Sequence, residues 1–166
     1  MKVCLDVDYR NDDASVAAIV FDDWESDSIV EQHTVLVNGV HPYVPGEFYK
    51  RELPCLLAIL KKVQSPIDLI VVDSYVWLAT GVSGMGHHLY EALNSKTPVI
   101  GCAKTHFGTD DLSIAITRGQ SKTPLFITSV GVDDKLAAGY ISKMHGVNRV
   151  PTLLKKVDQL CRTAKY

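Results

Sequence analysis

The sequence predicts an α/β protein built on one mixed sheet, an antiparallel three-strand meander joined to parallel strands, with helices on both faces. The first segments alternate apolar and polar residues between tight turns, which is typical of half-buried strands. Two short, wholly apolar runs follow, as in buried parallel strands. Amphipathic stretches with helical spacing surround those runs. The 166 residues, 46% of them hydrophobic, are expected to form a single domain over residues 1–166.

The first three elements are predicted to be strands. Val3, Leu5 and Val7 alternate with polar residues along the strand expected over 2–9. Turn residues at 11–13 and 22–25 then separate strands expected over 14–21 and 29–37. Consecutive strands joined by tight turns predict an antiparallel meander.

Helices and further strands follow the meander. Apolar residues recur at helical spacing from Gly46 to Val63, and Pro54 within that segment predicts either a kink or a helix start near Leu53. The other expected elements are strands Ile67–Val72 and Pro98–Cys102, a hairpin of Leu112–Thr117 and Leu125–Thr128, and helices Ser83–Leu93, Asp133–Met144 and Pro151–Thr163. This order resembles the ribonuclease H-like plan.

Charge is distributed unevenly along a chain whose net charge is only −2. Acids dominate residues 1–47 and bases dominate 48–166, so the basic part could bind nucleic acid, although solvated helix faces give similar spacing. The four cysteines are scattered through apolar stretches, which predicts reduced thiols and a cytoplasmic protein. We expect no membrane span, because no apolar run reaches about 18 residues, and no signal peptide.

Carboxylates fall where α/β proteins form their sites. Asp6 lies inside the first apolar strand, and Asp73 follows the run 67–72. Acids at strand ends are often simply solvated, but a charge inside an apolar strand needs a partner. With Glu52 on the adjacent helix, these acids could hold Mg²⁺ or Mn²⁺, which would polarise a phosphate and activate water. Asp8 is expected to face the same side as Asp6 and is a candidate fourth acid.

Several motifs in this sequence resemble those of the endonuclease V family. The resemblance covers about residues 3–155, and its most specific part is the block from Pro42 to Pro54. The matching motifs are Cys4-Leu5-Asp6-Val7-Asp8-Tyr9, Pro42-Tyr43-Val44-Pro45-Gly46, Arg51-Glu52-Leu53-Pro54, Val71-Val72-Asp73 and Thr97-Pro98-Val99-Ile100-Gly101-Cys102-Ala103-Lys104.

The resemblance implies a metal-dependent endonuclease that cleaves DNA or RNA near deaminated bases, chiefly hypoxanthine in inosine. It implies that Asp6 and Asp73 hold Mg²⁺ or Mn²⁺, with Glu52 completing the site. Lys104 would contact the scissile phosphate. The residues implied to contact nucleic acid are Tyr43, as a wedge on a proline-stiffened loop, and Pro45, Gly46, Tyr75 and His88. A monomer is compatible with this reading, and the sequence leaves the oligomeric state open.

The sequence departs from the family pattern after the third acid. Residues 74–81 stand where the family has a glycine-rich loop, and Tyr75, Val76 and Trp77 predict an altered base pocket. The family's N-terminal helical extension also has no counterpart here. Two alternatives therefore remain open: a structure-specific nuclease with another substrate, and a nucleic-acid-binding module on the same scaffold with weakened catalysis.

Overall fold

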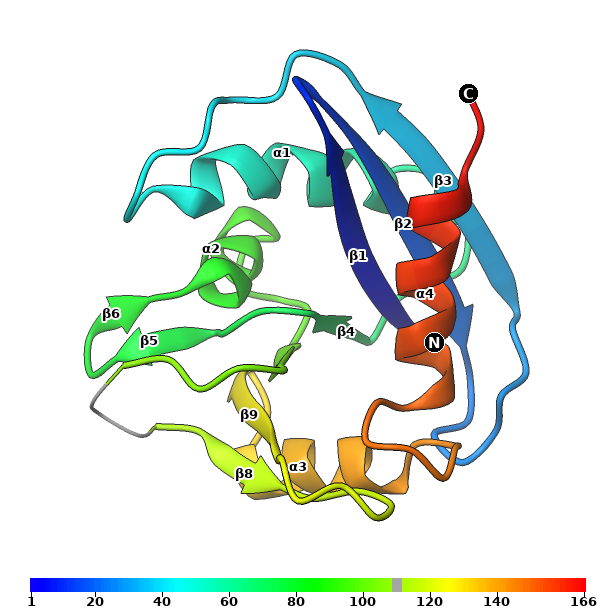
Figure 1. Ribbon diagram of the computed structural model, residues 1–166, viewed down its shortest axis with the longest axis vertical. Coiled ribbons are helices and arrows are strands. Elements are labelled where there is room, and N and C mark those ends of the chain that lie inside the picture. The colour runs from blue at the N-terminus through cyan, green and yellow to red at the C-terminus, as the bar shows by residue number, and fades with distance from the viewer. Residues whose placement is uncertain (109–111) are drawn as a thin grey trace.

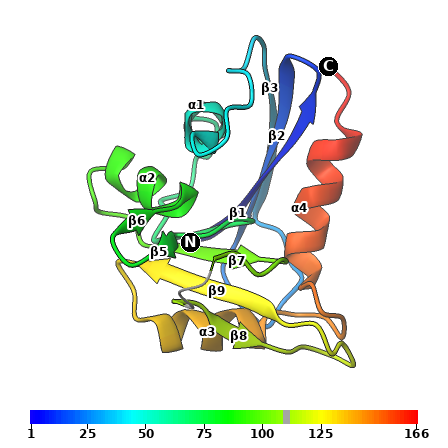
Figure 2. The same ribbon diagram turned by 60° about the vertical axis from the view of Figure 1, so that its left-hand side comes forward.

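The computed structural model describes residues 1–108 and 112–166. Its main sheet has seven strands in the order β3-β2-β1-β4-β7-β9-β8, and helices cover both faces (Figure 1 and Figure 2). The strands are β1 (Lys2–Arg10), β2 (Asp13–Phe21), β3 (Glu31–Val37), β4 (Leu69–Val72), β5 (Trp77–Ala79), β6 (Val82–Ser83), β7 (Val99–Ala103), β8 (Ile114–Ile116) and β9 (Leu125–Val130). The helices are α1 (Phe48–Leu60), α2 (Met85–Ala92), α3 (Asp134–Lys143) and α4 (Thr152–Thr163).

The predicted meander and the predicted parallel strands are both confirmed. Strands β1 and β2 pair along their whole length, from Lys2 opposite Phe21 to Arg10 opposite Asp13. Strands β4 and β7 continue the sheet in parallel with β1, and every residue of both is buried. The expected hairpin is also present, since β8 pairs antiparallel with β9.

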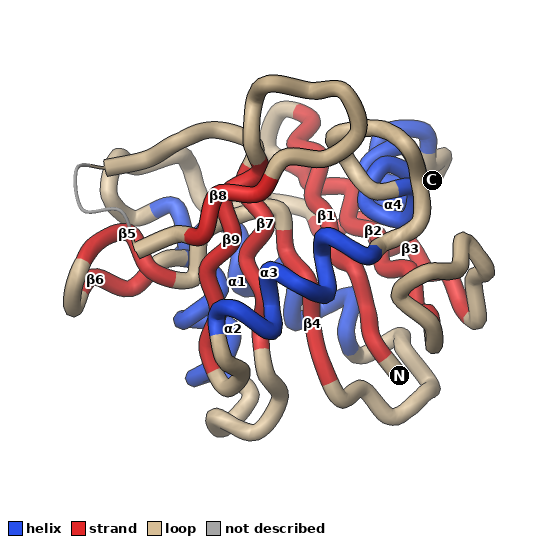
Figure 3. The backbone as a smooth tube through the Cα atoms, turned by 90° about the horizontal axis from the view of Figure 1, so that it is seen from below, coloured by secondary structure: helices blue, strands red, loops and turns tan. Residues whose placement is uncertain are grey.

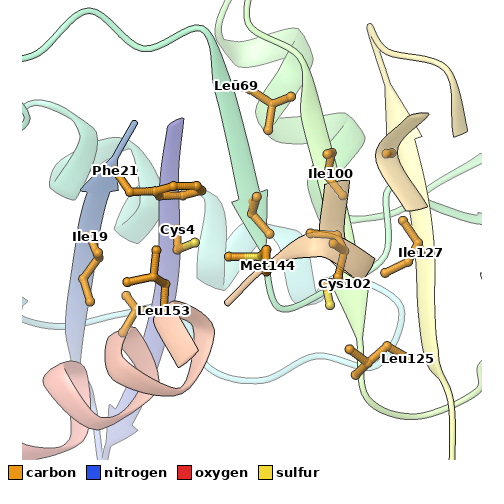
Figure 4. Packing of buried hydrophobic residues seen from close by; sticks show 14 of the residues in the cluster. Cys4, Ile19, Phe21, Leu69, Ile100, Cys102, Leu125, Ile127, Met144 and Leu153 are labelled. Atoms are coloured by element: carbon orange, nitrogen blue, oxygen red, sulfur yellow. The ribbon is translucent and has the colours of Figure 1, made fainter. Parts of the chain in front are cut away.

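Two hydrophobic cores fill the spaces between the sheet and its helices. On one face Cys4, Ile100 and Ile127 pack against α3 and α4, through residues such as Met144 and Leu153 (Figure 4). On the other face the alternate strand residues pack against α1 and α2. Because successive strand residues point to opposite faces, the alternation in β1 supplies both cores.

The structure corrects two expectations about element boundaries. Helix α1 begins at Phe48 and contains Pro54, which excludes a start near Leu53. The small hairpin of β5 and β6 was not expected, and α2 begins after it at Met85. The backbone N–H groups of Gly84 and Gly86 donate to the carbonyls of Val76 and Tyr75, at 2.7 and 3.0 Å. The chain before α2 is therefore held by the preceding loop.

Helix α4 lies beside β1 and β2 (Figure 3), and Arg10, the last residue of β1, fastens it there. The Arg10 guanidinium donates to three carbonyls at the helix C-terminus, those of Cys161 (2.9 Å), Arg162 (2.6 Å) and Ala164 (3.0 Å). These are carbonyls that a helix leaves without intrahelical partners. The contact fixes α4 beside β1, close to Asp6. None of the helices in the described ranges is long and apolar enough to cross a membrane.

Candidate active site

The sheet register brings two acids and a lysine to one edge. Leu5 of β1 pairs with Val72 of β4, so Asp6 and Asp73 follow side by side at the carboxyl ends of the paired segments. Lys104 directly follows β7, the next parallel strand. Carboxyl ends of neighbouring parallel strands are the usual position of sites in α/β sheets. The three side chains border a hollow of about 10 Å³, comparable to the space that one water needs.

Glu52 joins this group from α1, where it is only 9% exposed. Burial, followed by repulsion from Asp6 and Asp73, raises the pKa of Glu52 to about 8. Burial and the negative charge of Asp73 likewise raise the pKa of Asp6 to about 7. The predicted acids are therefore close enough to repel one another in a poorly solvated place.

Lys104 supplies the positive charge at this edge. Its ammonium donates to Oδ2 of Asp73 in an ion pair. Burial acts to lower the pKa of Lys104, but the bond to Asp73 and the charge of Asp6 outweigh it and raise that pKa. Lys104 is thus a cation at neutral pH and can face a phosphate beside the acids.

The donor set fits a small, hard divalent cation. Asp6, Glu52 and Asp73 offer carboxylate oxygens, the ligands that Mg²⁺ and Mn²⁺ prefer, and their mutual repulsion is what a cation would relieve. Over residues 1–108 and 112–166, no three Asp, Glu, His or Cys side chains already form a ligand cage. Mg²⁺ usually keeps several waters and needs one or two carboxylates, so a partial protein shell is enough.

An open cleft of about 640 Å³ adjoins the acids. Asp73 and Lys104 border it at one end. Of the residues implied to contact nucleic acid, Tyr43, Gly46, Tyr75 and His88 line the cleft, whereas Pro45 does not. The Tyr43 side chain is 62% exposed, as a wedge requires.

His88 lines this cleft without reaching the acid cluster. Its ring stacks on Tyr49 with centroids 3.8 Å apart, and Nδ1 is 4.0 Å from Oε2 of Glu91. Burial lowers the pKa of His88, so the ring is neutral at pH 7. We therefore assign His88 to the wall of the cleft.

Only one of the three bulky residues after Asp73 lines the cleft. The Tyr75 hydroxyl donates to the carbonyl of Thr105 at 3.0 Å and accepts from the amide of Phe107 at 3.2 Å. Val76 is fully buried, and the indole N–H of Trp77 donates to the carbonyl of Ser129 at 3.1 Å. The expectation that all three residues form the pocket is thus corrected to Tyr75 alone.

Asp8 does not join the acid cluster as the fourth acid that the sequence suggested. It accepts a hydrogen bond from Arg10 at 3.1 Å and belongs to the anchor of α4. Asp158 of α4, which the sequence did not indicate, lines a cleft together with Lys104, and its charge contributes slightly to the raised pKa of Asp6 and of Lys104. Only the docking of α4 on β1 could reveal Asp158, since it is distant in sequence from the other acids.

A ribonuclease H-like mixed sheet with acids gathered at its carboxyl edge defines a class of α/β nucleases. A sequence model of the endonuclease V family matches residues 2–150. Endonuclease V of Streptomyces avermitilis is 30% identical over 96% of this chain and 78% of its own length. Endonuclease V of Ignicoccus hospitalis is 29% identical over 96% of this chain and 80% of its own length. The chain belongs to the endonuclease V family.

Solved structures agree with this assignment. Endonuclease V from Streptomyces avermitilis superposes with a TM-score of 0.79 at 28% identity, covering 96% of this chain and 78% of that one. Endonuclease V from Ciona intestinalis was solved in complex with DNA containing an inosine followed by a ribo-adenosine. It superposes with a TM-score of 0.82 at 17% identity, covering 97% of this chain and 83% of that one. The second likeness establishes the shared fold.

Proposed function

We propose that this protein hydrolyses a phosphodiester bond in nucleic acid close to a deaminated base, with a divalent cation at the acid cluster. The observation that carries the proposal is that Asp6, Asp73 and Lys104 border one small hollow, with Glu52 buried within range of both acids. Asp73 and Lys104 also line the open cleft. Family membership supports the reaction class, because the matched relatives are named endonuclease V.

Each residue of the cluster has a distinct part in the proposed reaction. Asp6 and Asp73 would hold Mg²⁺ or Mn²⁺, with Glu52 as a further ligand, directly or through a water. When bound, the cation supplies charge neutralisation at the phosphate and lowers the pKa of a coordinated water. Lys104 faces the same phosphate and offsets the charge that develops during hydrolysis.

The cleft beside the cluster suits an unstacked base. Phe48, Tyr49, Tyr75 and Phe107 line it, and aromatic faces stack on any nucleobase. Tyr43 would enter an opened base step, as apolar and aromatic wedges do. The Ciona relative bound to inosine-containing DNA supports inosine as the first substrate to try. Tyr75, in place of a glycine-rich loop, would change which bases the pocket accepts.

We also propose that residues 1–166 act as one domain in a reducing, cytoplasmic compartment. Strands between residues 2 and 130 share one sheet, and α3 and α4 pack against it, which supports a single unit. Cys4, Cys55, Cys102 and Cys161 are all free and buried, as expected where disulfides do not form.

Cleavage assays with matched variants test the proposal. Inosine-containing and undamaged DNA and RNA, single-stranded and duplex, are incubated with Mg²⁺ or with EDTA. We expect cutting near inosine with Mg²⁺, and a loss of at least about 100-fold in Asp6→Asn and Asp73→Asn. Asp12→Asn, an exposed turn residue, serves as the charge-matched control.

The assay also separates the alternatives. Cleavage of branched or undamaged substrates in preference to inosine would identify a structure-specific nuclease. Binding that needs no metal, with every substrate left intact, would identify a binding module and overturn the enzymatic proposal.

A further inference from the structure

A second open cleft lies against the opposite side of Lys104. It has a volume of about 540 Å³ and is lined by Lys104, Asn148, Arg149, Lys155 and Asp158, together with apolar residues. The first cleft, of about 640 Å³, is lined by Phe48, Tyr49, Tyr75 and Phe107 and is called the aromatic cleft below. Among the described residues, Lys104 is the one that lines both clefts. Residues of α1 and α2 line the aromatic cleft, and residues of α4 line the second cleft. Helix α4 lies on the other face of the sheet from α1 and α2 (Figure 2).

A buried arginine holds the wall of the second cleft in place. Arg118 is 7% exposed, and its guanidinium donates to the carbonyls of residues 144–149. Its four acceptors are the carbonyls of Met144, Gly146 (3.1 Å), Asn148 (2.8 Å) and Arg149 (3.3 Å). Gly119 allows this approach, because a Cβ there would lie 2.1 Å from the Val147 carbonyl oxygen. The loop that carries Asn148 is therefore positioned before any ligand arrives.

The same arginine anchor adds positive charge behind the cleft. Across the described ranges, no Asp or Glu forms an ion pair with Arg118, and its bonds go to neutral carbonyls. Arg149 reinforces the wall by donating to the carbonyls of Lys104 and Pro124, the latter at 2.7 Å. In the described residues neither guanidinium group forms an ion pair with an acid, so no carboxylate offsets them behind the cleft.

Lys155 is the exposed cation available to a ligand in this cleft. Lys104 already pairs with Asp73, and Asp158 accepts from Arg162 at 2.9 Å. In the described part of the chain, Lys155 forms no ion pair, whereas its neighbour Lys156 pairs with Asp27 at 3.3 Å. Lys156, the next residue on the same helix, therefore has its charge paired with Asp27, outside the cleft.

We propose that the second cleft binds the sugar–phosphate backbone of the nucleic-acid strand, across the scissile phosphate from the aromatic cleft. The inference rests on the proposed function and adds the path of the strand. Among the described residues no aromatic side chain lines this cleft, so it offers charge and the Asn148 amide rather than a stacking surface. Such a surface recognises phosphates regardless of sequence. The strand then crosses Lys104, with a base on one side and phosphates on the other.

Salt titrations with two adjacent lysine variants test this path. Binding of an inosine-containing strand is measured in Ca²⁺ or EDTA between low and physiological salt, for wild type, Lys155→Ala and Lys156→Ala. We expect Lys155→Ala to weaken binding about threefold to tenfold at low salt and to reduce the slope of log K against log salt by about one. Lys156→Ala should leave the slope unchanged, because its charge is already paired.

Substrates shortened from either end locate the contact. The effect of Lys155→Ala should vanish when nucleotides are removed on one side of the cleavage point and persist when they are removed on the other. If the slopes of Lys155→Ala and wild type coincide while the wild type still cleaves, the path is wrong and the proposed function stands. If the wild type cleaves nothing yet Lys155→Ala changes the slope, the proposed function is wrong and the backbone cleft stands.

Discussion

Individual acids in this protein carry a cost in stability, which the proposed metal site would explain. The Glu52 carboxyl lies buried on α1 within reach of the charges on Asp6 and Asp73, and its pKa rises to about 8. A buried like-charged group has no benefit for folding alone. Such trade-offs between stability and activity are common at active sites.

Replacing Glu52 with Gln should therefore stabilise the metal-free protein in a pH-dependent way. The folded-state pKa is raised above the unfolded value, so wild type loses stability as pH rises from about 4.5 through about 8. Glu52→Gln lacks this loss, and its advantage should grow with pH to roughly 1–3 kcal/mol at pH 8.5. Urea unfolding in EDTA at pH 5, 7 and 8.5 measures it.

The control for this experiment lies just before the same helix. Glu47 is exposed and pairs with Lys50 at 2.8 Å, so Glu47→Gln should change stability little at any of these pH values. A constant difference between Glu52→Gln and wild type from pH 5 to 8.5 would contradict the repulsion argument.

At the scale of elements, the position of α4 depends on Arg10. Arg10→Ala leaves three carbonyls of the helix C-terminus without their donor, and we expect a loss of about 1–3 kcal/mol in the free energy of unfolding. Arg162→Ala removes an exposed i,i+4 pair on the same helix and should cost less than about 0.5 kcal/mol. Chemical denaturation measures the free energy of unfolding of both variants. Equal losses in Arg10→Ala and Arg162→Ala would show that the anchor has no special role.

Elements governed by local patterns were predictable, and those governed by distant contacts were not. Alternation in β1 and the apolar runs of β4 and β7 report burial directly. The β5–β6 hairpin is short and depends on backbone bonds from Gly84 and Gly86 to the preceding loop, so no periodicity marks it.

The residues of the candidate site also fall into those predictable from local sequence and those placed by distant contacts. Asp6 follows from a charge inside an apolar strand, Asp73 from the end of a buried strand, and Glu52 from the motif that contains it. Asp158 comes close to Asp6 only because α4 folds back onto β1, whereas Asp8 pairs with Arg10 on its own strand. Sequence spacing carries no signal for such a long-range encounter.

For the molecule as a whole, metal binding at the acid cluster should appear as thermal stability. A cation at about 100 times its dissociation constant adds roughly 2.7 kcal/mol, which is about 5–10 °C in melting temperature for a chain of this size. We expect this shift with Mg²⁺ or Mn²⁺ for wild type and little shift for Asp6→Asn.

NaCl at equal ionic strength controls for screening of the acid-rich and base-rich parts of the chain. An equal rise for wild type and Asp6→Asn would place the cation elsewhere on the molecule.

The position of Lys104 between two clefts has a consequence for turnover. An intact strand that occupies both clefts is held bivalently, and each cleft raises the effective concentration of the strand at the other. In the proposed reaction, hydrolysis beside Lys104 would sever that linkage and leave each fragment with only one point of attachment. The same cut that completes the reaction would thus loosen both products.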